Sequence, residues 1–458
     1  MRIDAVPKWD ISADVVILGT GAAGISAAIE AAGAGAETLL VEKERNPFKS
    51  ATVISGGAIS FAGTDLQAER GIEDSSDLFF SDLLKVGRSK NDVELVKTFM
   101  DLQLDTYYWL KSKGIEFLSI VVAAGMSVPR AHIARMGKTM SLLADGAKQA
   151  GARLQFDTKG ERLVTDEAGR VVGLKIAGPE GQKFVEARRG IIIATGGFGH
   201  SDQFASLTPI DVSKIRNFTA RNSTGDGLKM AFELGAGLSD LAYIRPTFGA
   251  AVNAASTHDM LLANYRGAII VNKMGKRFVD ESLPYKEIGS FALSQPQGVG
   301  IMIFDSKIRD KLQKYWLGLN SRLGKLCKEA PGIADLASAI DVPSGVLVDT
   351  VEQYNDYVER RDDREFGRKG LAGPVGEMVK LDTPPFYAFE AVGALVGTYA
   401  GLTIDTKTRV RNVFGEVIPG LYAVGEVIAG FHGAGYMTGT ALAKAFVLGR
   451  IAGREVAL

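Results

Sequence analysis

The chain has 458 residues, 46% of them hydrophobic and 23% charged, which is enough for two or three domains with buried cores and excludes a disordered chain. Its 53 basic and 53 acidic side chains cancel, which argues against a general surface for nucleic acid or anionic membranes. The single cysteine, Cys327, excludes an intrachain disulfide and a cysteine metal site. The four histidines lie at no metal-ligand spacing, so no metal is predicted.

The cellular location is predicted from two patterns. The N-terminal stretch MRIDAVPKWDISAD has no apolar core of signal-peptide length. No uninterrupted run approaches the ~18 apolar residues that a membrane-spanning helix needs. We therefore expect a soluble, cytoplasmic protein without a membrane span.

The N-terminal elements form a recognisable unit. Residues 14–18 (DVVIL) have the pattern of a buried strand, GTGAAG at 19–24 is a glycine turn, ISAAIEAAGAG is typical of a helix, and ETLLVEK at 37–43 is a second strand. Strand, turn, helix and strand within about 30 residues indicate a βαβ unit.

The rest of the chain changes character near residue 240 and again near residue 389. The predicted elements are, in chain order, a small-residue loop (50–63), helices (74–113), a hairpin around 168–169, an apolar strand ending in ATGGFG (194–199), a loop entering a helix (221–236), aromatic loops and a helix (343–363), and glycine-rich strands before a final helix (440–454). Glycine-rich elements typical of nucleotide-binding domains lie at both ends of the chain, and the segment between them has a different composition. This predicts one domain interrupted by another.

The glycine turn predicts a dinucleotide site. Gly19 permits the tight turn, Gly21 lets a pyrophosphate approach the backbone, and Gly24 lets the helix pack on the strand. The phosphates would then lie at the helix N-terminus, and Glu42 at the end of the second strand could accept hydrogen bonds from a ribose. NAD and FAD both fit this pattern. The additional glycine-rich strands favour FAD, which extends along its domain.

The spaced motifs also carry a family resemblance. They are GTGAAG…VEK, SGG at 55–57, ATGGFG at 194–199, GDGLKMAFELGA at 225–236, IIVNKMGKRFVDE at 269–281 and YAVGEV…GTALAKAFVLGRIAG at 422–453. Over essentially its whole length the chain resembles the fumarate reductase/succinate dehydrogenase flavoprotein superfamily. The resemblance implies an α/β fold, with a Rossmann-like FAD-binding domain (1–240 and 389–458) interrupted by an inserted α+β capping domain (241–388).

The same resemblance implies which residues bind FAD. Gly19, Gly21, Ala22, Ala23, Gly24, Glu42 and Lys43 would hold the ADP half, while Ser50, Thr52, Ser55, Gly56 and Gly57 would line the pyrophosphate and the flavin edge. The remaining predicted contacts are Ala194, Thr195, Gly196, Asp226, Glu426, Thr440, Ala441 and Leu442. The last of these open a helix whose N-terminus would face the flavin. Ser50 stands where membrane-bound members attach FAD to a histidine, so we expect non-covalent FAD.

Four departures from the fumarate reductase pattern disfavour fumarate. Tyr285 in DESLPYKE replaces the catalytic arginine, and Tyr436 in HGAGYMTG replaces the arginine that clamps the substrate. Arg245 in YIRPT replaces a histidine, and VGTYAGL at 396–402 replaces HHTMGG. DESLPY and GYMTGT are instead similar to the ketosteroid dehydrogenase branch of the superfamily, in which the tyrosine of an NExxPY segment is the base.

This branch implies the α,β-dehydrogenation of a cyclic ketone. The Tyr436 hydroxyl and the Gly439 N–H would polarise the carbonyl, and Tyr285 would take the α-proton. The pKa of Tyr285 must then be lowered by neighbouring donors or positive charge. Flavin N5 would receive the β-hydride. Arg245 could pair with a carboxylate, and the chain looks short for a steroid dehydrogenase, so 4-oxocyclohexanecarboxylate is the specific prediction.

Several alternatives stay open at this point. The substrate could be a steroid or cyclohexanone, the reaction could run in reverse as an enone or fumarate-type reductase, or the flavoprotein could bind a ligand without turnover. Tyr285 could only pack in a turn, Tyr436 could be a structural hydroxyl, and Arg245 could form a structural ion pair. His432 could tune Tyr436. The electron acceptor, whether quinone, oxygen or an electron-transfer protein, is not predicted.

Overall fold

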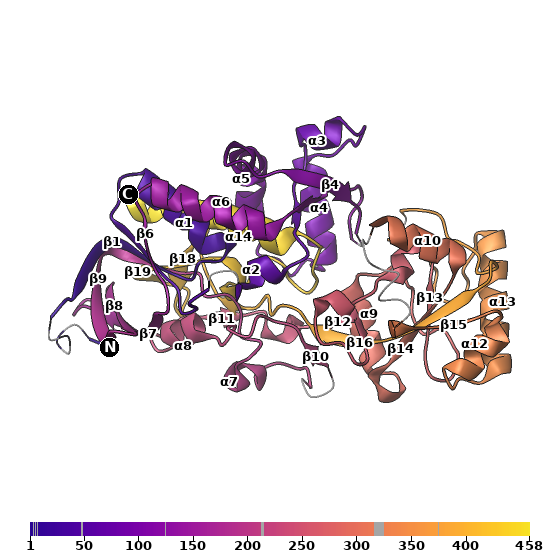
Figure 1. Ribbon diagram of the computed structural model, residues 1–458. Coiled ribbons are helices and arrows are strands. Elements are labelled where there is room, and N and C mark those ends of the chain that lie inside the picture. The colour runs from indigo at the N-terminus through magenta and orange to yellow at the C-terminus, as the bar shows by residue number, and fades with distance from the viewer. Residues whose placement is uncertain are drawn as a thin grey trace.

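The computed structural model describes residues 1–458 apart from 3, 5, 7, 47–48, 124, 212–214, 316–324 and 374. Its first sheet joins the two ends of the chain (Figure 1). The strands are β1 (Ile11–Leu18), β2 (Thr38–Val41), β6 (Arg153–Gln155), β7 (Lys159–Thr165), β8 (Val171–Gly178), β9 (Gly181–Ile193), β18 (Arg409–Arg411) and β19 (Val417–Ala423). Their main order is β18-β19-β9-β1-β2-β6, with β8 paired to β9 and β7 to β8.

The centre of this sheet is parallel and apolar. β1 pairs in parallel with β2 (Val15 opposite Thr38) and with β9 (Val16 opposite Ile191), and β19 pairs in parallel with β9. Side chains such as Ile17 are completely buried, as expected for strands covered on both faces. The predicted βαβ unit and the hairpin formed by β7 and β8 are therefore present.

Two helices from opposite ends of the chain pack together against this sheet. They are α1 (Ala22–Gly33) and α14 (Thr440–Ala457), and α6 (Met136–Gln149) packs on α1 (Figure 1). A Cβ at Gly449 would lie 2.4 Å from the Ala23 carbonyl oxygen, and one at Gly453 would lie 2.3 Å from that of Ala27. The absence of these side chains lets the helix backbones touch, which fixes the N-terminus of α14 beside the glycine turn.

The segment between β2 and β6 adds helices and a small sheet. Its elements are α2 (Ala51–Ile54), β3 (Ala58–Ser60), α3 (Asp65–Ala68), α4 (Ser76–Val86), α5 (Val93–Ser112), β4 (Phe117–Val121) and β5 (Ala131–Ala134). The prediction of a loop over residues 50–63 is thus wrong in part. The strand at 58–60 exists because it pairs with residues 131–133, a partner that its own small side chains do not reveal.

The second sheet carries a separate hydrophobic core. It contains β10 (Arg216–Asn217), β12 (Thr247–Ala251), β13 (Ile269–Val271), β14 (Gly300–Asp305), β15 (Cys327–Ala330) and β16 (Phe386–Leu395). Around it lie α9 (Tyr285–Leu293), α10 (Ser306–Tyr315), α12 (Ile333–Ala339) and α13 (Ser344–Arg360), drawn from salmon-red to orange in Figure 1. The connecting elements are α7 (Asp202–Ala205), α8 (Asp226–Phe232), β11 (Leu238–Ser239) and β17 (Gly401–Leu402).

The mixed α/β fold class is confirmed by this architecture. The second sheet extends from residue 216 to residue 395, and the domain boundaries at 240/241 and 388/389 stay a prediction. Among the helices of the described residues, none combines the length and apolarity that crossing a membrane requires.

Candidate active site

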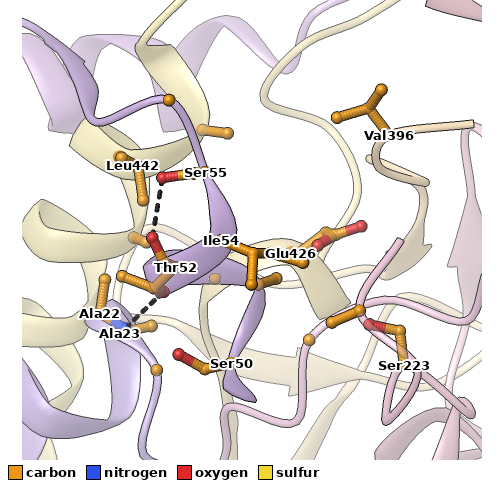
Figure 2. A pocket seen from close by; sticks show the side chains of 18 of the residues that line it. Ala22, Ala23, Ser50, Thr52, Ile54, Ser55, Ser223, Val396, Glu426 and Leu442 are labelled. Atoms are coloured by element: carbon orange, nitrogen blue, oxygen red, sulfur yellow. Dashed lines mark hydrogen bonds between the residues drawn. The ribbon is translucent and has the colours of Figure 1, made fainter. Parts of the chain in front are cut away.

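A cavity of about 800 Å³ lies where the two parts of the fold meet. Its walls include the glycine turn, the 50–58 segment and the start of α14 from one part, and residues such as Thr247, Met260, Tyr265 and Tyr285 from the other. Figure 2 shows Ser50, Thr52 and Ser55 on one side of this space and Glu426 and Ser223 on the other. Of the predicted site residues, Gly24, Thr440 and Arg245 do not line the cavity.

The glycine turn is shaped by backbone contacts. Gly19 has φ +102°, a conformation that favours glycine, and a Cβ there would lie 2.4 Å from the Ala194 carbonyl oxygen. A Cβ at Gly24 would lie 1.9 Å from the Gly19 carbonyl oxygen. Thr52 supports the start of α1 because its Oγ1 accepts a hydrogen bond of 3.0 Å from the Ala22 N–H (Figure 2).

Two acidic residues at this end of the cavity already have partners. Glu42 accepts hydrogen bonds of 2.9 Å from the N–H and the hydroxyl of Thr20. Asp226 pairs with Lys43 at 2.7 Å and with Lys159 at 2.9 Å. Burial works to raise the pKa of Asp226, but the hydrogen bonds from the two lysines outweigh it and the pKa is lowered. Asp226 therefore stays ionised and fixes Lys43 beside the turn.

The residues present fit FAD. The buried hydroxyls of Ser50 and Thr195 have no hydrogen-bond partner within the part of the chain that the structure describes, and both line the cavity. Buried polar groups without partners are rare, so a polar ligand is expected at each. Gly439 has φ +83° at the N-terminus of the 18-residue helix α14, whose dipole favours negative charge at this end.

The side chains of Tyr285, Tyr399 and Tyr436 form part of the cavity lining, which we call the tyrosine wall. Tyr285 is the first residue of α9, directly after Pro284, whose fixed φ of −53° suits a helix start. The Tyr285 hydroxyl lies 3.0 Å from Thr438 Oγ1, and its ring centroid lies 6.3 Å from that of Tyr436. Tyr436 is stacked on Tyr399, with 4.5 Å between centroids and 8° between planes. The structure thus brings Tyr285 and Tyr436 together, as the sequence analysis expected.

The electrostatics of these tyrosines differ from the expectation. Burial raises the pKa of Tyr285 well above its usual value and the neighbouring Tyr436 adds to this, while the hydrogen bond with Thr438 opposes it. Burial also raises the pKa of Tyr436, against hydrogen bonds from Tyr399 and from the backbone of Gly439 and Ala441. The Tyr436 hydroxyl therefore faces the start of α14, and the Tyr285 hydroxyl contacts Thr438 Oγ1.

His432 lies beside Tyr399 and Tyr436, and Arg245 lies near enough to Lys286 to affect its pKa. Arg245 is half-buried and forms no ion pair with any carboxylate that the structure describes. The ring of His432 is buried, with its centroid 5.0 Å from that of Tyr399 and 5.2 Å from that of Tyr436. Burial, and then the charges of Lys444 and Lys286, lower the pKa of His432 well below its usual range. The imidazole is therefore neutral.

Sequence reasoning missed Thr438, Tyr399 and Lys286. Thr438 stands inside the segment GYMTGT, and Tyr399 inside VGTYAGL, so both were quoted without being assigned a role. Lys286 follows Tyr285 directly, and only the structure shows that its ammonium group is buried against the tyrosines.

The fold and the site together define a flavin-dependent oxidoreductase. The family model described as "FAD binding domain" matches residues 14–442, and the chain belongs to that family. FAD is its cofactor, and the relatives act on carbon–carbon bonds.

The relatives span reductases and dehydrogenases. The chain is 33% identical to a "Fumarate reductase (cytochrome)" of Shewanella frigidimarina, over 97% of this chain and 77% of that protein. The open conformation of a flavocytochrome c3 fumarate reductase superposes with a TM-score of 0.78 at 28% identity, covering 98% of this chain and 78% of that one. The 3-ketosteroid-Δ4-(5α)-dehydrogenase from Rhodococcus jostii RHA1, solved with 4-androstene-3,17-dione, gives a TM-score of 0.82 at 26% identity.

This last comparison corrects one argument from length. The superposition covers 100% of this chain and 99% of the steroid dehydrogenase. The expectation that the chain is short for a steroid dehydrogenase is therefore wrong, because the two chains are nearly equal in length. Resemblance to the superfamily, including its ketosteroid dehydrogenase branch, is confirmed.

Proposed function

We propose that the chain catalyses α,β-dehydrogenation of a cyclic ketone. The observation that carries this proposal is the pair of hydroxyls at the cavity wall, Tyr285 on Thr438 and Tyr436 at the start of α14. The resemblance to fumarate reductases implies an arginine at each of these two positions. Fumarate is a dianion and needs cationic partners, whereas a ketone needs a hydrogen-bond donor for its oxygen and an acceptor for its α-proton.

The chain's own residues would hold the cofactor along the cavity. Gly19 to Gly24 and Lys43 would receive the ADP half, Ser50, Thr52 and Thr195 would bond its polar groups, and the N-terminus of α14 would face the ring. When bound, FAD supplies the two-electron acceptor for the β-hydride.

The acid–base step follows from the hydroxyl pair. The Tyr436 hydroxyl and the Gly439 N–H donate to the carbonyl oxygen and stabilise the enolate. Burial keeps Tyr285 protonated at rest, so Tyr285 must release its own proton before it takes the α-proton. The Thr438 hydroxyl, 3.0 Å away, can relay that proton by passing its own hydroxyl proton to water. The low polarity of the wall strengthens these hydrogen bonds by excluding water.

The same residues support the reverse reaction. The 33% identity to a fumarate reductase favours reduction of an enone as the second candidate. Proton donation by Tyr285 to the α-carbon would then replace proton abstraction. A flavoprotein that binds a ketone without turnover is the third candidate. Binding alone would not explain the contact between the Tyr285 and Thr438 hydroxyls.

Anaerobic mixing of the FAD-loaded protein with cyclohexanone, 4-oxocyclohexanecarboxylate and a 3-ketosteroid tests the proposal. Desaturation bleaches the flavin band near ~450 nm, whereas binding alone shifts it. Bleaching by at least one ketone is expected. A spectral shift without bleaching, for every ketone that binds, would refute the dehydrogenase and leave an enone reductase or a binding protein. Reoxidation of the dithionite-reduced protein by an enone would then identify a reductase.

Arg245 gives the proposal its finer substrate class. Its guanidinium is half-buried and has no carboxylate partner among the described residues, which suits an acidic group on the substrate. Arg245 does not line the cavity, so this pairing requires its side chain to turn toward the substrate. Arg245→Leu is expected to lower kcat/KM for 4-oxocyclohexanecarboxylate by about 30-fold and for cyclohexanone by less than about 3-fold, since a charged hydrogen bond contributes about 2 kcal/mol. The exposed Arg364→Leu serves as the control. Equal losses on both ketones would refute the pairing with a carboxylate.

A further inference from the structure

Lys286 is a buried cation against the tyrosine wall. It is the second residue of α9, and only 5% of it is exposed. Its Nζ lies 4.2 Å from the ring centroid of Tyr399 and 5.5 Å from that of Tyr436. Both distances fall within the ~6 Å of a cation–π contact. No carboxylate that the structure describes lies within ion-pair distance of this ammonium group.

The ring that receives this cation is held in an unusual conformation. Tyr399 has φ +50°, which is rare for a bulky residue. A Cβ at Gly397 would lie 2.8 Å from Tyr399 Cζ, so the glycine makes room for the ring. Strained residues of this kind persist where the surroundings impose them, and they gather at functional sites. Lys286, Tyr399 and Tyr436 therefore form one assembly, which we call the lysine–tyrosine stack.

Burial brings the pKa of Lys286 close to neutral pH. Burial lowers its pKa to about 7, Glu426 opposes this, and Arg245 adds to it. The neighbouring His432 is neutral, and Tyr285 and Tyr399 stay protonated because burial raises their pKa values. On α9 itself Glu287 is engaged by Arg88 at 2.8 Å. The ammonium form is thus present below about pH 7 and lost above it.

We propose that Lys286 is a positioning residue of the reaction: its ammonium group holds Tyr399 against Tyr436, so that the Tyr436 hydroxyl stays at the N-terminus of α14 where it receives the ketone oxygen. This inference rests on the proposed function for its catalytic meaning. Its physical content, a tyrosine stack controlled by the charge on Lys286, is independent of the substrate.

The first experiment follows the stack without any substrate. Near-ultraviolet circular dichroism of the FAD-loaded protein, recorded from pH 5.5 to 9, is expected to change with a midpoint near pH 7. Lys286→Met and Tyr399→Leu are expected to abolish this transition. Lys444→Met is the matched control, because Lys444 is also buried with a pKa lowered to about 8, yet its Nζ contacts Phe431 rather than a tyrosine. A transition that survives in Lys286→Met, or vanishes in Lys444→Met alone, would overturn the proposal.

The second experiment links the stack to the site. A phenol such as 4-cresol presents an oxygen like that of the enolate, and its binding to the oxidised protein is read from the shift of the flavin spectrum. Binding to the wild type is expected to weaken about tenfold between pH 6 and pH 9. Binding to Lys286→Met should be weak throughout, and Lys286→Arg should stay tight at pH 9 because arginine keeps its charge. Equal, pH-independent binding by all three would refute positioning by Lys286.

These two readouts separate the inference from the function it rests on. If no ketone bleaches the flavin and no phenol binds the wild type, the proposed function fails, while the dichroism of the Lys286 variants still decides whether the stack exists. If ketones bleach the flavin of Lys286→Met at the wild-type rate across the pH range, the proposed function stands and the positioning role fails.

Discussion

Tyr285→Phe is expected to lower the rate constant of flavin reduction by a cyclic ketone about 10³-fold while FAD stays bound. The substitution removes one hydroxyl and leaves the ring that lies against Tyr436. Positioned acid–base groups contribute about 10²–10⁴ to rates, and among the described residues Tyr285 is the one whose hydroxyl contacts Thr438 Oγ1, at 3.0 Å. Anaerobic stopped-flow absorbance measures the loss, and FAD content by absorbance confirms that the cofactor site is intact.

Two further variants make this result specific. Tyr354→Phe is the control, because Tyr354 is completely buried in the core of the second sheet, away from the cavity, and its rate should stay within about twofold. Thr438→Val keeps the shape of the side chain but removes the proton partner, and an intermediate loss of about 10–100-fold is expected. Flavin reduction by Tyr285→Phe at the wild-type rate would show that another group takes the α-proton.

The burial of Lys286 also makes the free energy of unfolding depend on pH. Its pKa lies below that of an unfolded lysine, so between pH 7 and 10.5 the unfolded chain binds more protons and stability rises with pH. The charged form below pH 7 is the one that burial penalises and the one that holds the stack. A residue kept in a costly environment by its role at a site is consistent with the usual conflict between stability and activity.

The parts of the fold that sequence predicted are those determined locally. The strand–turn–helix unit around Gly19 and the hairpin at 168–169 follow from patterns within a few residues, and both are present. The segment 50–63 failed because its structure depends on pairing with residues 131–133, some 70 positions away. Small side chains fit a loop, a short helix and an edge strand equally well, so the partner decides.

The site was predictable only as far as a motif marks a single residue. The resemblance to fumarate reductases implies an arginine at the positions of Tyr285 and Tyr436, and this singled them out. The stack on Tyr399 and the contact with Thr438 need residues near 286, 399 and 438 to meet in space, which depends on how the second sheet lies against α14. Two other features also depend on the folded chain. Arg245 has no carboxylate partner among the described residues, and Glu42 accepts hydrogen bonds from Thr20.

Gly21→Ala is expected to weaken FAD binding at least about 100-fold while leaving the apoprotein as stable as the wild type, since this position is where the backbone approaches a pyrophosphate. Gly21 has φ −67°, which alanine adopts freely, and an added Cβ would meet only Thr52 Oγ1, at 3.4 Å. Fluorescence titration of the apoprotein with FAD measures the affinity, and thermal unfolding without FAD measures stability.

Gly24→Ala provides the contrast within the same turn. Its Cβ would lie 1.9 Å from the Gly19 carbonyl oxygen, so the apoprotein itself should lose more than about 3 kcal/mol of unfolding free energy through overpacking. The two alanines therefore separate a glycine required by the ligand from one required by the fold. Tight FAD binding by Gly21→Ala would mean that the pyrophosphate does not pass over this part of the backbone. The pyrophosphate would then have to be placed beside Ser50 and Thr195, whose buried hydroxyls lack protein partners among the described residues.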